Sequence, residues 1–295
     1  MVVRRHSADD AYDIIVASAS RPHLLLRTLT SLARVDVPPR KIILHDDAVF
    51  PHQYDEIVRV VEYATKPVTG TVPYVMTQHD PPVRHGPALA WLLAQTDAEF
   101  VLYTQDDHEV VRDLPIARAL DVMRTHDLNQ IRFNKRATLD YKDTWQGRWY
   151  KKEFSMSMSV ALPAAVALPS VVDAHDTIAA SYPPPRIVTL HQTLTVSDHW
   201  YFQTSLWRVS VIKPIVLTLM ARAPGAFAYR CEDLINAELD LRYATSLGHD
   251  ARDPDVRAKY LRTFIWGRIG EDRYVQHIGD HPEDFARPRD VWEVL

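Results

Sequence analysis

The chain has 295 residues, of which 46% are hydrophobic, so it can bury a large core as one large domain or two smaller ones. Its net charge of −4 supplies no overall positive field for nucleic acid or an anionic membrane. The single cysteine, Cys231, excludes an intrachain disulfide and a cysteine-rich zinc site, and it fits a reducing compartment.

No apolar run reaches the roughly 18 residues of a membrane span. The first ten residues also lack the apolar core of a signal peptide. We therefore expect a cytoplasmic protein without a membrane span, whose oligomeric state the sequence leaves open.

Four apolar runs with strand character alternate with three segments of helical periodicity. The predicted strands are residues 13–18, 41–44, 72–76 and 100–103. Ser20 is expected to be the N-cap of the first helix, with Pro22 in its first turn. This alternation predicts right-handed parallel crossovers and a sheet covered by helices.

Each predicted strand changes from apolar to polar at its carboxyl end. Because the carboxyl ends of parallel strands share one edge, where ligands bind, two acidic pairs are expected there. Hard divalent cations select such oxygen ligands. The alternative is an ordinary polar loop after each strand. The four polar ends are Ser18-Ala19-Ser20, His45-Asp46-Asp47, Gln78-His79-Asp80 and Gln105-Asp106-Asp107-His108.

Neither common phosphate-binding loop is present. No G-x-G-x-x-G follows the first strand and no G-x-x-x-x-G-K-[ST] occurs. A bound diphosphate would therefore need a metal ion, and Asp106 and Asp107 are placed to hold it.

The second half of the chain is richer in basic and aromatic side chains. Residues 130–152 hold seven basic residues against two acidic ones, interleaved with five aromatic residues. Such a mixture suits stacking on bases or sugars together with phosphate contacts, which makes Arg132 and Lys135 acceptor candidates. The alternative is a strand-and-turn segment with buried aromatics. The aromatic stretch 199–212, with Trp200 and Trp207, is expected to line a pocket or to pack a second small sheet.

Two further motifs lie near the end of the chain. Cys231-Glu232-Asp233 is expected to open a helix, where acidic residues are also ordinary capping choices. Residues 274–279 predict a short strand with His277 near its end.

The order of these motifs resembles nucleotide-sugar-dependent glycosyltransferases of the GT-A fold, in particular their family-two-like group. The resemblance runs from Asp13 to Gly279. It rests on I-I-V-A-S-A-S-R-P at 14–22, H-D-D at 45–47, R-H-G-P-A-L-A at 84–90, Q-D-D at 105–107, C-E-D at 231–233 and Y-V-Q-H-I-G at 274–279.

The resemblance implies an α/β fold with a mixed, mostly parallel central sheet, helices on both faces and a smaller C-terminal subregion on the acceptor side. It implies one continuous domain. Residues 1–128 would form the nucleotide-sugar-binding half and residues 129–295 the acceptor-binding and catalytic half.

The resemblance also implies roles for individual residues. Asp107 and His277 would bind Mn²⁺ or Mg²⁺, because glutamine replaces the first aspartate of the Asp-x-Asp motif. Asp233, next to Glu232, would be the catalytic base. The residues expected to bind the nucleotide sugar are Ser18, Ser20, Arg21, Asp46, Asp47, Arg84, Gly86, Gln105 and Asp106.

The implied function is metal-dependent and inverting transfer of a hexose or pentose from a nucleoside-diphosphate sugar, with UDP as the expected nucleotide. Two acceptors stay open: a hydroxyl of a glycan, small molecule or protein, and a hydroxymethylated pyrimidine in DNA. One alternative is a nucleotidyltransferase of related fold, although residues 17–20 lack the usual glycine. The other is a non-catalytic protein that binds sugar or nucleic acid.

Overall fold

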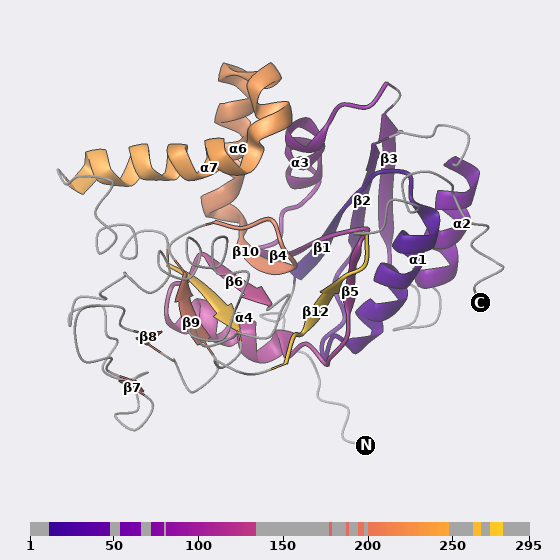
Figure 1. Cartoon of the computed structure of the whole chain (residues 1–295), viewed down its shortest axis with the longest axis horizontal. Helices are drawn as coiled ribbons and strands as arrows, with labels where there is room; N and C mark the ends of the chain where they lie inside the picture. The colour runs from indigo at the N-terminus through magenta and orange to yellow at the C-terminus, as the bar shows by residue number, and fades with distance from the viewer. Residues whose placement is uncertain are drawn as a thin grey trace, which may run out of the picture. The chain divides into compact units, whose positions relative to one another are not determined.

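The computed structural model describes residues 12–47, 54–65, 72–79, 81–133, 177–178, 187–188, 194–197, 200–247, 262–266 and 272–279 (Figure 1). Contacts divide the chain into two units that are discontinuous in sequence. The first comprises Met1–Asp121, Phe202–Cys231 and Tyr274–Leu295, and the second Val122–Tyr201 and Glu232–Arg273. The predicted halves, 1–128 and 129–295, stay a prediction.

The first unit contains a mixed, mostly parallel sheet. Its strands are β1 (Tyr12–Ser18), β2 (Ile42–Asp47), β3 (Tyr74–His79), β4 (Phe100–Gln105) and β10 (Ser205–Arg208). In space they follow the order β3-β2-β1-β4-β10. The first four are parallel to their neighbours, and β10 runs antiparallel to β4. Ile14, Ile15 and Val16 are at most 1% exposed, since both faces of a parallel strand are covered.

Helices cover both faces of this sheet. They are α1 (Pro22–Ser31) with the short η2 (Leu32–Arg34), α2 (Tyr54–Thr65), α3 (His85–Ala94) and α6 (Val209–Arg222). α1 and α2 pack together on one side of β1–β3, and α3 packs with α6 on the other (Figure 1). The predicted α/β class with helices on both faces is confirmed.

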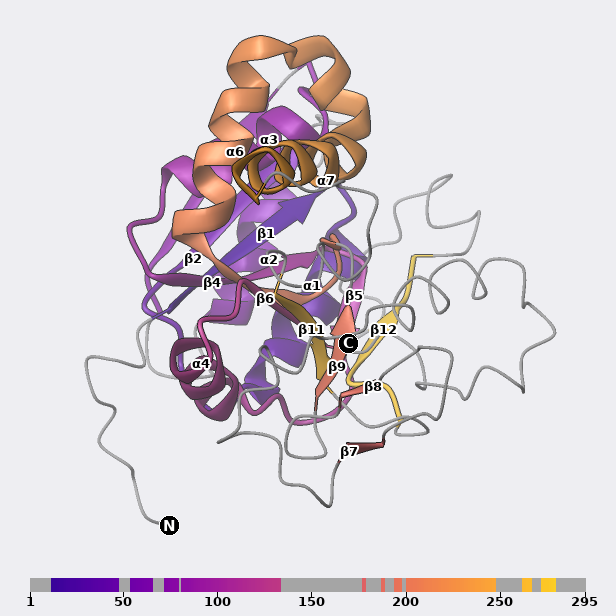
Figure 2. The same ribbon diagram turned by 90° about the vertical axis from the view of Figure 1, so that its left-hand side faces the viewer.

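A second, smaller ladder brings the chain's tail to the first unit. The strand β5 (His108–Val110) follows β4, and β12 (Val275–His277) pairs with it in the antiparallel direction. The predicted short strand around residue 276 is therefore confirmed. The view in Figure 2 shows β5 and β12 side by side.

The second unit contributes the remaining described strands. Its described strands are β6 (Gln130–Phe133), β9 (Leu194–Ser197) and β11 (Thr263–Trp266), with a separate antiparallel pair of β7 (Thr177–Ile178) and β8 (Ile187–Val188). β11 pairs with β6 in the parallel and with β9 in the antiparallel direction. The helices α4 (Ile116–Thr125) and α7 (Pro224–Leu247) each cross from one unit into the other.

A kink divides the helix α7. Arg230 has the non-helical angles φ −131° and ψ 36°. Cys231, Glu232 and Asp233 follow this kink directly. Residue 231 therefore begins the second segment of α7 and not a separate helix. None of the described helices is long and apolar enough to cross a membrane.

Two local predictions are wrong. Arg21, not Ser20, occupies the N-cap of α1, and no side-chain hydrogen bond caps it. The described part of the aromatic stretch, residues 200–212, forms no second sheet: its strand β10 joins β4, and Trp207 stacks on Tyr103 with ring centroids 4.3 Å apart. Most of the basic and aromatic stretch 130–152, with Lys135, lies outside the described residues.

Gly86 in the first turn of α3 tests this packing. A Cβ at this position would lie 2.3 Å from the carbonyl oxygen of Phe227, a contact that only a backbone shift can relieve. We expect Gly86→Ala to lower the free energy of unfolding by about 1–3 kcal/mol, as overpacking does. Urea unfolding measures the change.

Gly225→Ala is the matched control. Its Cβ would meet nothing within 4 Å, and it lies in the first turn of α7. This variant should be neutral or more stable by up to about 1 kcal/mol, since alanine is the better helix former. Wild-type stability of Gly86→Ala would contradict the close approach of α3 to Phe227.

Candidate active site

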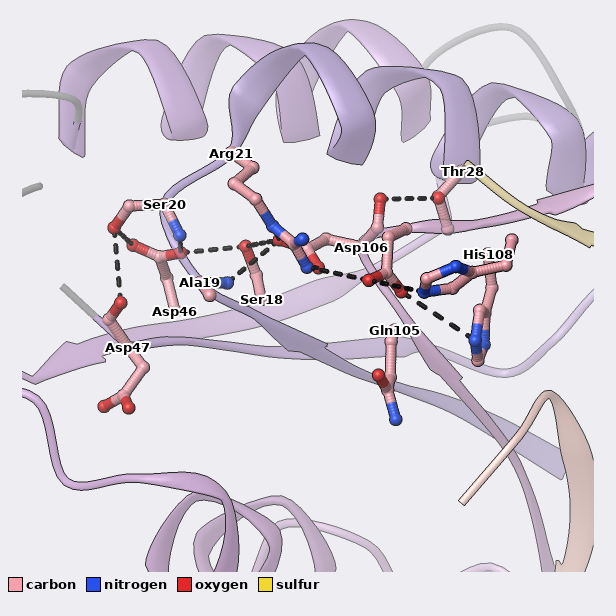
Figure 3. A network of polar contacts seen from close by, with 12 residues as sticks. Ser18, Ala19, Ser20, Arg21, Thr28, Asp46, Asp47, Gln105, Asp106 and His108 are labelled. Carbon is pink, nitrogen blue, oxygen red and sulfur yellow. Dashed lines mark hydrogen bonds and ion pairs between the residues drawn. The ribbon is translucent and has the colours of Figure 1, made fainter. Parts of the chain in front are cut away.

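Polar side chains gather at the carboxyl ends of β1, β2 and β4. The strand register pairs Ser18 with Asp46 and Ala17 with Gln105, which brings the ends of these three strands level. Figure 3 shows the resulting network of hydrogen bonds and ion pairs. The edge therefore joins residues that lie up to 88 positions apart in the chain.

Asp46 ties three strand ends together. Its carboxylate is completely buried and accepts hydrogen bonds from Ser18 Oγ at 2.8 Å, Ser20 N at 2.7 Å, Ser20 Oγ at 2.9 Å and Gln78 Nε2 at 2.7 Å. Both carboxylate oxygens are engaged by these donors. Asp46 thus holds the turn after β1, where Ser20 has the positive φ of 55°.

Arg21 bridges the two adjacent aspartates after β4. Its guanidinium makes a two-pronged ion pair with Asp106, and Nη2 also donates to Asp107 Oδ2 at 3.1 Å. Burial raises the pKa of Asp106 to about 6, against the opposing charge of Arg21. Burial alone would lower the pKa of Arg21, but the charges and hydrogen bonds of the two carboxylates raise it above its usual value. The guanidinium therefore stays charged at neutral pH.

Asp107 meets the tail of the chain. His277 Nε2 lies 3.2 Å from Asp107 Oδ2, across 170 positions of sequence. The backbone of Ile278 donates to the Asp107 carbonyl at 2.9 Å, and a Cβ on Gly279 would lie 2.9 Å from Asp107 Cβ. The tail therefore packs directly on this aspartate, and the two predicted metal ligands come together.

The second oxygen of the Asp107 carboxylate, Oδ1, differs from Oδ2 in its contacts. Oδ1 has no hydrogen-bond partner among the described residues, although it is buried. Burial raises the pKa of Asp107, but the hydrogen bond from His277 and the charges of His108 and Arg21 outweigh it and hold the pKa well below its usual value. An ionised, buried oxygen without a donor is suited to a cation.

One donor atom from each of Asp107, His108 and His277 lies within 4.8 Å of the others. One carboxylate oxygen and imidazole nitrogens are a donor set for a divalent cation, so these residues fit the metal that the sequence predicts. His108 was missed as a candidate. It follows the Q-D-D motif directly, but only the pairing of β5 with β12 shows that it lies opposite His277.

Asp47 holds the start of α3. Its carboxylate accepts from the backbone N–H groups of Val83 at 2.6 Å and Arg84 at 2.8 Å. Arg84 has the positive φ of 74°, and its exposed guanidinium lies 5.6 Å from the ring centre of Tyr229. The hydrogen bonds of Asp47 thus fix the backbone at Arg84, whose side chain lies at the edge of the site.

Gln105 is held at the end of β4 by two hydrogen bonds. Its amide donates to Tyr103 Oη at 2.9 Å and to the carbonyl of Phe202 at 3.0 Å. The ring of His85 in turn lies 2.9 Å from Tyr103 Oη. Gln105 therefore braces the end of β4 against the first turn of α3, next to Gly86.

The remaining predicted residues lie mostly in the second unit. Asp233 is exposed and Glu232 half-buried on α7. Arg132 on β6 is buried, with its guanidinium 4.0 Å from the ring centre of Tyr201. Trp200 in this unit and Trp207 in the first unit are completely buried, so neither indole presents a face to an acceptor.

His45 at the end of β2 is a buried imidazole. Its Nε2 lies 2.8 Å from His79 Nδ1, and the two rings stack with centroids 4.9 Å apart. Burial, with the neighbouring His79, lowers the pKa of His45 to about 4. The folded state therefore holds this ring neutral.

The pH dependence of stability tests this burial. Between pH 4 and 6.5 the unfolded chain binds a proton at residue 45 that the folded chain does not. Stability should thus be complete above pH 6.5 and fall towards pH 4, by up to about 1.4 kcal/mol per pH unit from this group. Urea unfolding in EDTA across this range measures the slope. His45→Gln should have a shallower slope, and equal slopes would contradict the assignment.

Comparisons with known proteins find similarity in solved structures alone. No protein-family model and no curated protein matches the chain. S. aureus TarS 1-349 matches over 93% of this chain and 62% of that chain, with 13% identity and a TM-score of 0.48. The mannosyltransferase PcManGT from Pyrobaculum calidifontis, in complex with GDP-Man and Mn²⁺, matches over 84% of this chain and 68% of that chain, with 12% identity and a TM-score of 0.47. At these values the likenesses decide neither the family nor the activity of this chain, which spans less than two thirds of the TarS fragment.

Proposed function

We propose that the chain is a metal-dependent glycosyltransferase of the GT-A type, which moves a sugar from a nucleoside-diphosphate sugar to an acceptor hydroxyl. One observation carries the proposal: the buried carboxylate of Asp107 meets His277 from the far end of the chain and keeps one oxygen without a hydrogen-bond partner among the described residues. The order of the motifs between Asp13 and Gly279, which resembles that of GT-A glycosyltransferases, supports the proposal.

The donor would lie along the carboxyl edge of the sheet. Asp107 and His277 would hold Mn²⁺ or Mg²⁺, which neutralises charge on the departing nucleoside diphosphate when it is bound. Arg84 would contact a phosphate or the ribose. Asp46 and Asp47 are the candidates for a hydrogen bond to the nucleobase. Asp47 is the stronger candidate, because it is partly exposed whereas Asp46 is completely buried.

Ser18, Ser20, Arg21 and Asp106 would shape this edge through their mutual hydrogen bonds. We propose UDP as the nucleotide of the donor. The four residues named above have an indirect part in its binding. Their side chains are already engaged with one another, so we assign them to the wall of the donor site rather than to direct binding.

Asp233 would accept the proton of the acceptor hydroxyl as it attacks the anomeric carbon, with inversion of configuration. General-base help of this kind contributes about 10²–10⁴-fold to the rate, and the anomeric centre becomes oxocarbenium-like. Its exposure on α7 supports access to an acceptor. The proposed acceptor is a glycan hydroxyl, and a hydroxymethylated pyrimidine in DNA is the second class to be offered.

Separate substitution of Asp107 and Asp233 tests the proposal. Nucleoside-diphosphate sugars are screened with Mn²⁺ for hydrolysis, and the preferred donor is then offered with glycan and modified-DNA acceptors. Asp107→Asn should weaken metal-dependent donor binding and lower transfer by at least about 100-fold. Asp233→Asn should lower kcat by about 10²–10⁴-fold and leave donor binding unchanged.

Asp113→Asn is the control, because this carboxylate is 90% exposed and lies outside the site. It should transfer sugar like the wild type. Near-full transfer by Asp107→Asn or Asp233→Asn would defeat the role of that residue. Release of pyrophosphate would identify a nucleotidyltransferase instead, and donor binding without turnover would leave only a binding protein.

A further inference from the structure

His108 and His277 lie directly opposite one another in the antiparallel β5–β12 ladder. Residues opposed in this way have their side chains on the same face of the ladder, with Cβ atoms about 4.5–5.5 Å apart. The two imidazole centroids are 5.6 Å apart, and the rings are inclined at 63°. The strand register therefore builds a second imidazole into the Asp107 cluster.

Each imidazole has one nitrogen close to one oxygen of the Asp107 carboxylate. Asp107 Oδ2 lies 3.2 Å from His277 Nε2, and Asp107 Oδ1 lies 3.8 Å from His108 Nε2. Two donors that each bind one cation at about 2.1 Å can be at most about 4.2 Å apart. Each of these two distances, one from either oxygen of the carboxylate, is within this limit. The oxygen of Asp107 without a hydrogen-bond partner among the described residues is the one nearer to His108.

A pair of buried threonine hydroxyls stands behind His108. Thr204 Oγ1 lies 3.3 Å from His108 Nδ1 and 2.9 Å from Thr104 Oγ1. All three residues are at most 2% exposed. With Nδ1 donating to Thr204, the hydroxyl of Thr204 can donate onward to Thr104. The lone pair of the imidazole then lies on Nε2, on the side of Asp107.

We propose that His108 is a third protein ligand of the metal and that Thr204 is a positioning residue that fixes its tautomer. The inference rests on the metal site of the proposed function and narrows it. Histidine ligands commonly donate their second N–H to such an outer partner. The protein then supplies two nitrogen atoms and one oxygen atom, a set that suits Mn²⁺ and later transition metals, whereas Mg²⁺ keeps to oxygen ligands. The site therefore selects Mn²⁺ over Mg²⁺.

Counting the nitrogen ligands of Mn²⁺ tests this inference without donor or acceptor. Mn²⁺ is titrated into the full chain, free Mn²⁺ is followed by electron paramagnetic resonance, and pulsed measurements of ¹⁴N coupling count the imidazoles on the bound ion. The wild type should show two. His108→Ala and His277→Ala should each show one, with Mn²⁺ affinity lowered about 10–100-fold. A hundred-fold excess of Mg²⁺ should leave Mn²⁺ bound to the wild type.

Three further variants separate positioning from folding. Thr204→Val should keep two nitrogen ligands but weaken Mn²⁺ binding about tenfold, and Thr204→Ser should restore it. His126→Ala, which removes a half-buried histidine outside the cluster, should bind Mn²⁺ like the wild type. Circular dichroism checks that each variant is folded. The number of nitrogen ligands in the wild type tests the inference even if a variant fails to fold.

The outcomes distinguish this inference from the proposed function. One nitrogen ligand in the wild type, or wild-type Mn²⁺ binding by His108→Ala, would overturn the third ligand and leave the proposed function intact. Displacement of Mn²⁺ by an equal concentration of Mg²⁺ would overturn the selectivity. Absence of any Mn²⁺ binding by the wild type would overturn the metal site of the proposed function and this inference with it.

Discussion

Charge balance at the end of β4 governs the architecture of this site. Asp106 and Asp107 are adjacent and buried, and desolvating each carboxylate costs of the order of several kcal/mol. Arg21 supplies one positive charge to the pair. Two carboxylates and one guanidinium leave one negative charge, and Asp107 Oδ1 is the oxygen without a hydrogen-bond partner among the described residues. A cation bound there would complete the balance that Arg21 begins.

The position of Arg21 depends on a second buried carboxylate. Asp46 accepts from both the backbone and the hydroxyl of Ser20, which has φ 55°. A non-glycine residue in this region is held against a cost of about 1–3 kcal/mol. The hydrogen bonds of Asp46 offset that cost and turn the chain so that Arg21, the N-cap of α1, faces Asp106. The contacts at this edge therefore depend on one another: an aspartate on β2 positions the arginine that bridges the two aspartates after β4 and balances one of their charges.

The sequence predicts the elements of this edge better than the contacts within it. Strand-like apolar runs and segments of helical periodicity are local features of the sequence. Their alternation predicted β1 to β4 and the polar residues at the ends of these strands. Which side chains pair with one another at this edge is not a local property of the sequence. Asp107 and Ser20 belong to networks that depend on strand register and on a positive φ, and neither leaves a periodic trace in the chain. The role of Trp207 was missed for the same reason, because aromatic density does not tell a core strand from a pocket wall.

Gln105 and His108 together determine the donor atoms of the proposed metal site. In the motif that the sequence resembles, the first position is an aspartate, and here its amide replacement braces Tyr103 and Phe202 instead. The carboxylate of the first motif position is therefore absent at residue 105, and the imidazole of His108 directly follows Asp107. Losing a negative oxygen weakens a site for hard cations, whereas an added nitrogen favours softer ones. With glutamine at position 105 and His108 as a proposed ligand, the cluster would offer a cation more nitrogen and less oxygen than the Asp-x-Asp motif does, while Asp107 keeps its place.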